Sequence, residues 1–583
     1  MKNKHFVLIG VVAFALFIRL IFLNRFPIGM SHDELNYIIA AKSLFWAHLF
    51  PPGTAPAVLP ISMSNFTVII AEVPALILAP LIGIFSSSLF ISRVLGAILS
   101  VSTVLAVYFI AFHITKKRSV ALICALLMSI NPWSFLMGRT IFEVNFFVAF
   151  FLWGFLVLLK SKGWKIFCAL SLFLLGFFSY TGGQLGFFLF IVVTLAYHYF
   201  ISKDDRKNLK IYIIFFCLIS LVLVGYILTT TRNQTFQARS SELYLPNQQA
   251  ISETVDQERK LAIASPFNSL FINKATVYFG GFINKYLNTF SMNTLFLTGE
   301  TRAAFSYQTH GTFYLIDFLF IIVGLSSLFV INKKSWILFV SIIICCSVTS
   351  GLNVVENSYS QRVGLIYPFL VMLSGIGVGT VISAAKSKKV QIILALGIAV
   401  IYLISLVNLM FIYFVRFPVY ASDGWFFQDR VLSNYLIRSE ETYPNTKILI
   451  YTSEPKIIFE EYLFYNNIYT GENVLSINEH LNQKDYSINN LVFTDECPIE
   501  GPDKNSVIIF DGSFICNKLS TLSNLVRITR LKDVLANYLV YNDKLCNYIN
   551  LNRYVPQSAY DNFSVEKQSP KDFCLNWLTK IEQ

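Results

Sequence analysis

The feature that most constrains this chain is the recurrence of apolar runs long enough to cross a lipid bilayer. A membrane-spanning helix needs roughly 20 predominantly apolar residues, because each residue advances the helix by about 1.5 Å. Such runs recur from the first residues to about position 415. We expect a polytopic α-helical membrane protein with about eleven spans, near 6–23, 93–115, 119–137, 144–160, 166–181, 184–201, 211–229, 312–331, 335–351, 363–384 and 390–415.

Basic residues gather in the gaps between these runs and set the expected topology. The clusters are KKR at 116–118, KSKGWK at 160–165, SKDDRKNLK at 202–210, NKK at 332–334 and AKSKK at 385–389. With a cytoplasmic N-terminus, every cluster falls on the cytoplasmic side, as the positive-inside rule requires. This agreement holds only if the apolar stretch at about 65–85, which contains Glu72, Pro74 and Pro80, forms a re-entrant or interfacial helix instead of a span.

The composition excludes a soluble protein and a nucleic-acid binder. Of the 583 residues, 55% are hydrophobic and 14% are charged, and the mean hydropathy is +0.59. A soluble domain cannot keep so much apolar surface from water. The formal net charge of +12 comes from the basic gaps between spans, which is a topology signal and not a nucleic-acid footprint. We therefore expect a multi-pass cell-membrane protein surrounded by lipid, with no nucleic-acid partner.

The topology also predicts the domain organisation. Outside the membrane lie a first loop at about 24–92, a long loop at 230–311 and the whole tail. We predict a transmembrane domain over residues 1–425 and a soluble extracytoplasmic α/β domain over 426–583.

Short apolar runs and cysteines describe the expected tail domain. KILIY (447–451), NLVFT (490–494) and SVIIF (506–510) are typical of buried strands, and PKIIFEEYLFYNN between the first two predicts a helix. Cys497, Cys516, Cys546 and Cys574 permit disulfides in an oxidising compartment, with three possible pairings.

An adjacent acid pair, Asp33 and Glu34, follows the first span in GMSHDELNYIIAAKSLF. One interpretation is structural: solvated acids in a loop, or an N-cap by Ser31 or Asp33 for a helix beginning near Leu35. The other is functional, with a carboxylate acting as a general base or a metal ligand. The pair alone does not decide between them.

A second constellation, Arg139 and Glu143, lies at the outer mouth of a span in GRTIFEVNFFVAF. A carboxylate there is costly unless it is paired or hydrated. A local Arg–Glu pair at four-residue spacing would satisfy it. Alternatively, Glu143 faces Asp33 across a cavity, where the two carboxylates could share a divalent cation such as Mg²⁺ or Mn²⁺.

Further candidates lie before two later spans. Arg362 in SQRVGLIYPFLVML either snorkels to water or holds a phosphate with its two-pronged guanidinium, and Tyr367 lies just deeper in the span. Glu300, Arg302 and His310 in FLTGETRAAFSYQTHGTFYL precede another span and could close over the same cavity.

Four segments in this order resemble the GT-C glycosyltransferases that use polyprenyl-phosphate sugars. They are DELNY (33–37), GRTIFEVNFFVAFF (138–151), FLTGETR…THGTFYL (296–315) and SQRVGLIYPFLVMLSGIG (360–377). The resemblance covers about residues 5–425 and is strongest to the bacterial branch related to protein O-mannosyltransferases and to the aminoarabinose transferase of lipid A.

The resemblance implies a function and residue roles. Asp33 would be the catalytic base and Glu34 its neighbour or a metal ligand, Glu143 would position the acceptor or a metal, and Arg362 would bind the lipid phosphate. The expected donor is a polyprenyl-phosphate sugar, with the acceptor a protein, a lipid or a cell-envelope glycan. No glycine-rich dinucleotide fingerprint for a soluble nucleotide sugar is present.

The alternative function is a lipid or polysaccharide transporter or flippase. Transporters place charged residues near the bilayer midplane and are often built from repeated halves. In this sequence the acids cluster at one face and no internal repeat is visible, which favours the enzyme.

Overall fold

The structure is a computed structural model of the whole chain. It describes residues 3–51, 54–56, 68–160, 166–201, 210, 213–215, 217–218, 221, 248–352, 360–497, 505–512, 514, 525–533, 535–561 and 563–580.

Long apolar helices make the chain a multi-pass membrane protein. Among the described residues, five helical segments are long and apolar enough to cross a membrane: α4 (Leu89–Thr115), α7 (Glu143–Lys160), α16 with α17 (Lys333–Gly351), α18 (Ile366–Ala384) and α19 with its extension (Lys388–Tyr420). A sixth arises if the bent pair α8 (Ile166–Phe177) and α9 (Gln184–Ile201) is one span.

Other predicted spans correspond to shorter apolar helices. These are α1 (Asn3–Leu20), α5 (Arg118–Ile130) and α15 (Leu315–Ile331). The predicted span at 119–137 is divided, because Asn131 accepts a hydrogen bond from the backbone nitrogen of Ser134 and caps a new helix, α6 (Pro132–Met137). Most of the predicted span at 211–229 lies outside the described residues, so the count of eleven stays a prediction.

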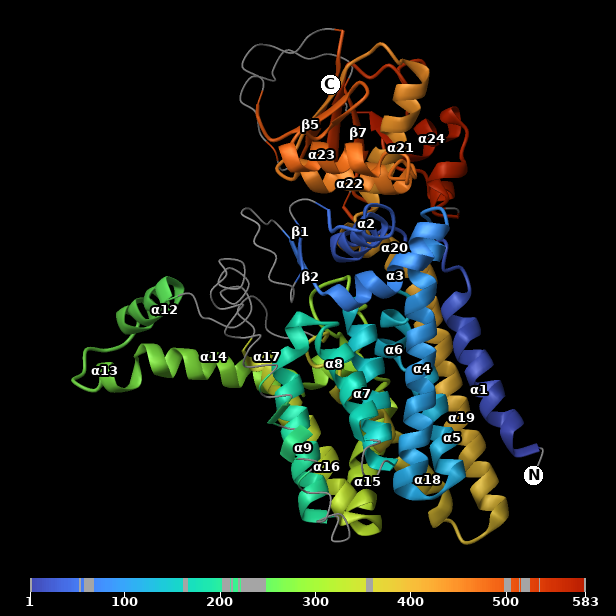
Figure 1. Cartoon of the computed structure of the whole chain (residues 1–583), viewed down its shortest axis with the longest axis vertical. Helices are drawn as coiled ribbons and strands as arrows, with labels where there is room; N and C mark the ends of the chain where they lie inside the picture. Colours follow the sequence, from blue (N-terminus) through green and yellow to red (C-terminus); the bar gives the residue numbers. More distant parts are fainter. Residues whose placement is uncertain are drawn as a thin grey trace.

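The bundle has two distinct ends (Figure 1). The N-terminus of α1, the α4–α5 connection and the α18–α19 connection lie at the end far from the C-terminal sheet. At the other end, α2 (His32–Ala47) lies between the bundle and the C-terminal domain, and α3 (Glu72–Ile84) runs across the bundle. With 13 residues, α3 is too short to cross a bilayer of ordinary thickness.

Three helices of the predicted long loop project sideways from the bundle. They are α12 (Gln248–Lys260), α13 (Asn268–Phe271) and α14 (Lys274–Asn288), and α14 packs its end against α17 (Val348–Gly351). Large apolar side chains on these helices are exposed, including Phe271 and Phe279.

A mixed seven-stranded sheet organises the C-terminal region. Its order is β4-β5-β3-β6-β8-β7-β9. The strands are β3 (Ile448–Tyr451), β4 (Ser487–Ile488), β5 (Leu491–Thr494), β6 (Val507–Asp511), β7 (Val526–Thr529), β8 (Ala536–Tyr541) and β9 (Leu578–Lys580). The three predicted strands are confirmed as β3, β5 and β6, which pair in parallel with β3 in the middle. The predicted helix is confirmed as α22 (Pro455–Tyr465).

Helices cover this sheet and connect it to the bundle. Besides α22, these helices are α21 (Phe427–Thr442), α23 (Val474–Gln483) and α24 (Pro570–Trp577). Lys42 Nζ of α2 donates to the carbonyl oxygen of Tyr469 at 2.8 Å, and Asn478 Nδ2 donates to Ser43 Oγ at 3.1 Å. The first loop and the C-terminal domain are therefore packed as one unit.

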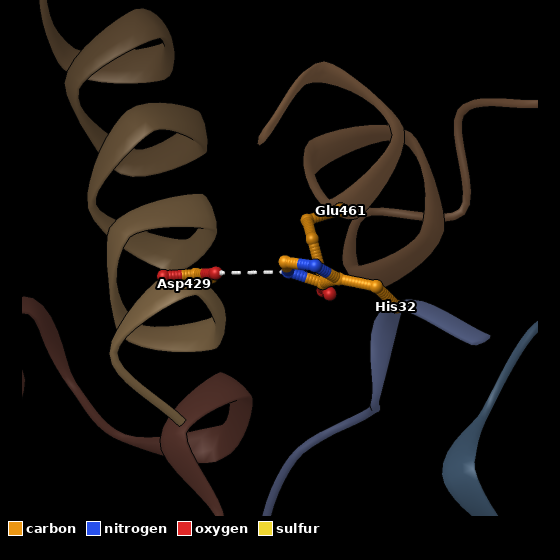
Figure 2. A group of neighbouring side chains, drawn as sticks. All are labelled: His32, Asp429 and Glu461. Carbon is orange, nitrogen blue, oxygen red and sulfur yellow. Dashed lines mark ion pairs between the residues drawn. The ribbon is translucent and has the colours of Figure 1, made fainter. Parts of the chain in front are cut away.

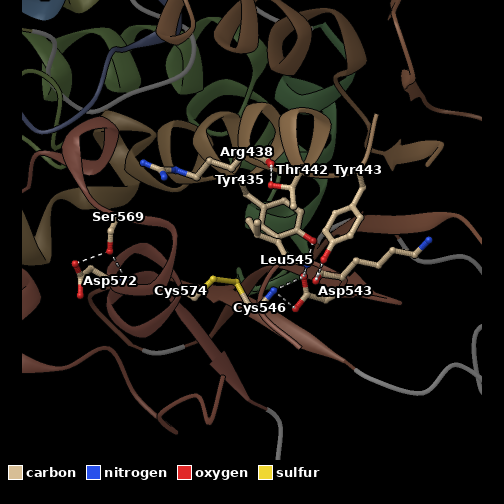
Figure 3. Close-up of a disulfide and its surroundings, with 11 residues drawn as sticks. Tyr435, Arg438, Thr442, Tyr443, Asp543, Leu545, Cys546, Ser569, Asp572 and Cys574 are labelled. Carbon is tan, nitrogen blue, oxygen red and sulfur yellow. Dashed lines mark hydrogen bonds between the residues drawn. A yellow bond between two sulfur atoms is a disulfide. The ribbon is translucent and has the colours of Figure 1, made fainter. Parts of the chain in front are cut away.

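Within the described part of the tail, a disulfide joins Cys546 to Cys574 (Figure 3). It joins the segment after β8 to α24, close to the buried Asp543, which accepts hydrogen bonds from Tyr435 and from the backbone of Cys546. Disulfides persist in oxidising compartments. The extracytoplasmic location of this domain stays a prediction.

Candidate active site

The N-terminus of α2 carries the predicted acid pair in a capping box. Ser31 is the N-cap, and its Oγ accepts from the backbone nitrogen of Glu34 while Glu34 Oε2 accepts from the backbone nitrogen of Ser31, each at 3.3 Å. The helix therefore begins at His32, three residues before the predicted start near Leu35. This box fixes where each acid points.

Glu34 is fully buried and paired with Arg93 of α4. Arg93 Nη2 donates to Glu34 Oε2 at 2.8 Å, and Nε donates to Oε1 at 3.1 Å. The backbone nitrogen of Ile141 also donates to Oε1, at 3.0 Å. Two-pronged arginine–carboxylate pairs of this kind are strong and directional. These contacts join α2 to α4 and to the turn before α7, so we expect Glu34 to position its neighbour.

Arg93 also holds the chain that enters α2. Its Nη1 donates to the carbonyl oxygen of Pro27 at 2.8 Å, its Nη2 donates to that of Gly29, and its guanidinium lies 5.5 Å from the ring of Trp425. A Cβ on Gly29 would lie 1.9 Å from the carbonyl oxygen of Trp425, so only glycine fits at this close approach.

Asp33 is exposed and lines a cavity of about 460 Å³. Arg302 from the loop before α15, Tyr420 after α19 and Lys532 of the C-terminal domain line the same cavity. Four separate parts of the chain thus enclose a space whose lining includes the Asp33 carboxylate and two basic side chains.

A second cavity of about 450 Å³ adjoins the first, and both are lined by His32, Asp423 and Phe426. It lies at the carboxyl ends of β3 and β6, where Thr452 and Asp511 contribute to its wall. Because β5 and β6 flank β3 on opposite sides, this is the point where strand order reverses. Ligands of open α/β sheets bind at such points.

Phe305, which lines the Asp33 cavity, contacts Ser360 and Phe142, which lie close in sequence to Arg362 and Glu143. Glu300 Oε2 accepts from the backbone nitrogen of Ser360 at 2.6 Å, and Ser360 Oγ donates to the carbonyl oxygen of Phe305 at 3.4 Å. On the other side, the ring of Phe305 lies 5.1 Å from that of Phe142, directly before Glu143.

Arg362 is buried and has a basic neighbour. Burial, followed by the positive charge of Arg362, lowers the pKa of Lys285 in α14. Two cations held near one another at the edge of the bundle favour an anion with more than one charged oxygen. Most of the segment before Arg362, residues 353–359, lies outside the described residues.

The remaining predicted site residues lie in packed surroundings. Arg139 is fully buried and donates to Tyr413 Oη at 2.9 Å and to the carbonyl oxygens of Ile18, Arg19 and Phe26, which is not the predicted local pair with Glu143. The ring of Tyr367 lies 4.6 Å from that of Trp133. His310 Nδ1 lies 2.8 Å from the carbonyl oxygen of Gly311, and burial lowers the pKa of His310.

One group of side chains has the geometry to hold a metal ion, among the residues that the structure describes. His32, Asp429 and Glu461 each offer one ligand atom, all within 4.8 Å of one another (Figure 2). The predicted metal ligands Asp33 and Glu143 do not belong to this group. Their shared cation stays a prediction.

Sequence reasoning missed the partners of the acid pair. Arg93 lies near the start of an apolar run, where a charged residue signals a pairing partner, and this signal was present in the sequence. His32 directly precedes the acid pair, but Asp429 and Glu461 lie about 400 residues away, and no local pattern connects them to it.

No protein-family model matches the chain, and no curated protein matches its sequence. Among solved structures it is similar to the archaeal oligosaccharyltransferase AglB from Archaeoglobus fulgidus, in complex with an inhibitory peptide and a dolichol-phosphate. That alignment has 13% identity and a TM-score of 0.42 and covers 87% of this chain and 70% of that one.

The chain is also similar to ArnT from Cupriavidus metallidurans in two states. The apo structure aligns with 10% identity and a TM-score of 0.45, over 93% of this chain and 98% of that one. The structure bound to undecaprenyl phosphate aligns with 12% identity and a TM-score of 0.44, over 92% and 98%. All three alignments extend over most of this chain at low sequence identity.

Proposed function

We propose that this protein is an integral-membrane glycosyltransferase that moves a sugar from a polyprenyl-phosphate donor to an acceptor at the outer membrane face. The observation that carries the proposal is the placement of Asp33. The Glu34–Arg93 pair fixes the helix start rigidly, and Asp33 is left exposed in a cavity at the end of the apolar helices. The order of the four sequence segments that resemble GT-C enzymes supports the same function.

The proposed reaction is a single displacement that inverts the anomeric carbon. An acceptor hydroxyl forms the new bond to that carbon, its proton passes to Asp33, and the bond to the phosphate oxygen breaks. A carboxylate within hydrogen-bond reach of the hydroxyl can act as this base. The polyprenyl phosphate leaves with the bonding electrons, and Arg362 and Lys285 stabilise the charge that develops on it.

The two adjoining cavities suggest how the substrates are divided. The donor phosphate lies at the membrane edge near Arg362, and the acceptor extends from Asp33 past His32 into the cavity at the end of β3 and β6. Arg302 and Glu300 belong to the loop that closes the Asp33 cavity. Glu143 positions a substrate, and a Mg²⁺ or Mn²⁺ ion binds near it.

The remaining candidates act from outside the two cavities. Tyr367 and His310 contact a substrate deeper toward the span, while Arg139 fixes the first helix against the turn before α7. The proposed orientation places the N-terminus in the cytoplasm and the C-terminal domain outside. Labelling of single cysteines introduced at 116–118 tests it, since an impermeant reagent should leave them unmodified in intact cells.

The test of the activity uses the full chain in nanodiscs with a panel of labelled polyprenyl-phosphate sugars. Asp33→Asn keeps the shape of the side chain but removes the base, so turnover should fall by about 10²- to 10⁴-fold. Asp485→Asn, at an exposed aspartate bonded to His480, is the matched control and should leave turnover unchanged. Near-normal turnover of Asp33→Asn would remove Asp33 from the mechanism, and donor flipping without sugar transfer would favour a transporter.

A second variant separates donor binding from base catalysis. Arg362→Lys keeps the charge but loses the two-pronged geometry, so both donor affinity and single-turnover rate should fall, by roughly 10- to 150-fold at the limit of a lost charge-assisted hydrogen bond. An arginine that only snorkels to water would be replaced by lysine without either effect. Equal behaviour of the two proteins would place the phosphate site elsewhere.

A further inference from the structure

Glu461 is a buried carboxylate that accepts no hydrogen bond from the residues that the structure describes. It lies on α22, its side chain is fully buried, and neither of its two carboxylate oxygens has a hydrogen-bond partner within this part of the chain. Buried polar groups are nearly always hydrogen-bonded, and a buried charge without compensation is expensive. Something outside the protein's own hydrogen bonds must therefore satisfy this side chain.

The surroundings of Glu461 are acidic. Burial, followed by the negative charges of Asp429, Glu460 and Glu34, holds the pKa of Glu461 well above its usual range, and Arg93 opposes this only weakly. Two agents can relieve such a cluster, a proton on Glu461 or a bound cation. The geometry of the neighbouring side chains distinguishes between them.

His32 and Asp429 are oriented toward Glu461 as a pair of metal ligands would be. The imidazole of His32 is stacked on Phe426, with ring centroids 3.5 Å apart. Its buried Nε2, which has no hydrogen bond among the described residues, lies 3.8 Å from Asp429 Oδ2. Tyr538 Oη donates to the other oxygen of Asp429 at 2.7 Å, the kind of outer contact that orients a ligating carboxylate. Figure 2 shows the three side chains converging from separate segments.

We propose that His32, Asp429 and Glu461 bind a divalent transition-metal ion, for which Zn²⁺ is the best match. Imidazole nitrogen and carboxylate oxygen are both ligands that Zn²⁺ takes in proteins, whereas Mg²⁺ prefers oxygen ligands throughout. A fourth ligand can be water, because His32 and Asp429 also line the 450 Å³ cavity.

The ion would fasten the first loop to the C-terminal domain. His32 is the first residue of α2, Asp429 belongs to α21 and Glu461 to α22. The residue after His32 is Asp33, so the same ion would fix the position of the proposed base without contacting it. The metal site itself does not depend on the proposed sugar transfer.

Metal content of the purified full-length protein in detergent is the first measurement. EDTA first removes bound metal, and the protein is then loaded with one equivalent of ZnCl₂ per chain and dialysed. Elemental analysis should find that one Zn²⁺ per chain is retained. Glu461→Gln and His32→Gln should each retain at least tenfold less. Glu460→Gln is the matched control, because Glu460 is a neighbouring buried glutamate on the same helix that pairs with Lys456 at 3.7 Å, and it should bind normally.

Thermal unfolding is the second measurement and shows that the variants are folded. Zn²⁺ binding only to the folded chain stabilises it by mass action, so Zn²⁺ should raise the unfolding temperature of the wild type and of Glu460→Gln but not of Glu461→Gln. Mg²⁺ should raise none of them. Absence of Zn²⁺ from the wild type, or full retention in folded Glu461→Gln, would overturn the proposal and leave Glu461 as a protonated acid. Neither measurement involves sugar transfer.

Discussion

Two buried glutamates lie at the junction of the first loop and the C-terminal domain, and they differ in how their buried charge is compensated. Glu34 and Glu461 are both fully buried, and they lie close enough for the charge of Glu34 to raise the pKa of Glu461. Glu34 has a counter-charge in Arg93 and backbone donors from Ser31 and Ile141. Glu461 has no hydrogen bond from the described residues.

We call the contacts around each glutamate a joint. The Glu34 joint is permanent, whereas the Glu461 joint depends on a proton or an ion. The Glu34 joint is complete within the chain, so it holds α2 against the bundle under all conditions. The Glu461 joint, between α2 and the C-terminal domain, needs a proton or an ion from outside. We therefore expect the first joint to respond to mutation and the second to respond to the solution.

The largest expected effect on stability comes from removing the counter-charge of Glu34, which leaves it uncompensated as Glu461 is. Arg93→Met removes the counter-charge and leaves a buried carboxylate uncompensated, which should lower the free energy of unfolding by about 3–5 kcal/mol. Denaturant unfolding in detergent measures this. Arg302→Met, at an exposed arginine, should change it by no more than about 0.5 kcal/mol.

A double variant tests the cause of that loss. Adding Glu34→Leu to Arg93→Met removes the uncompensated charge, and much of the lost stability should return, because apolar replacements of buried pairs are often tolerated. If the double variant is as unstable as Arg93→Met alone, the loss comes from packing and not from charge.

A smaller effect of opposite sign is expected at the other glutamate. In the presence of a chelator, Glu461→Leu removes an unsatisfied buried carboxyl group and should raise the free energy of unfolding by about 1–3 kcal/mol. In saturating Zn²⁺ the same variant should be the less stable protein. A loss of stability in chelator would mean that Glu461 has a partner in the metal-free protein.

The smallest effect concerns Lys42, a buried cation at the same junction. Burial lowers its pKa from 10.5 to about 8, so between these values the unfolded chain binds a proton that the folded chain does not. The free energy of unfolding therefore rises with pH across this window, by about 1 kcal/mol between pH 7.5 and 9. Lys42→Met, which cannot titrate, should lack this rise, and the difference between the two proteins is the quantity to measure. A parallel response of both would assign the pH dependence to other groups.

The sequence predicted the elements whose pattern is local. Runs of apolar residues identified most of the described long helices, and the strands β3, β5 and β6 followed from short buried runs such as Val507–Asp511. The antiparallel strands β7, β8 and β9 were not predicted, because they mix polar with apolar residues without a regular pattern and their burial depends on neighbours distant in sequence.

The candidate site was predictable only in part, for the same reason. Asp33 and Arg302 were expected near one cavity, and the structure lines one cavity with both. The pairing of Glu34 with Arg93 requires α2 and α4 to be placed relative to one another, which no spacing rule supplies. The contribution of Asp429 and Glu461 depends on how the C-terminal domain sits on the first loop.

The packing of the first loop against the C-terminal domain also has a consequence for synthesis. The backbone nitrogen of Met30 donates to Tyr465 Oη across 435 residues, and Arg430 donates to the carbonyl oxygen of Ile28 across 402. At a ribosomal rate of about 5–20 residues per second, the segment that carries Asp33 waits roughly 20–80 s for these partners. A chain that ended before Phe427 would lack these contacts, so the surroundings of Asp33 are completed only by the last part of the chain.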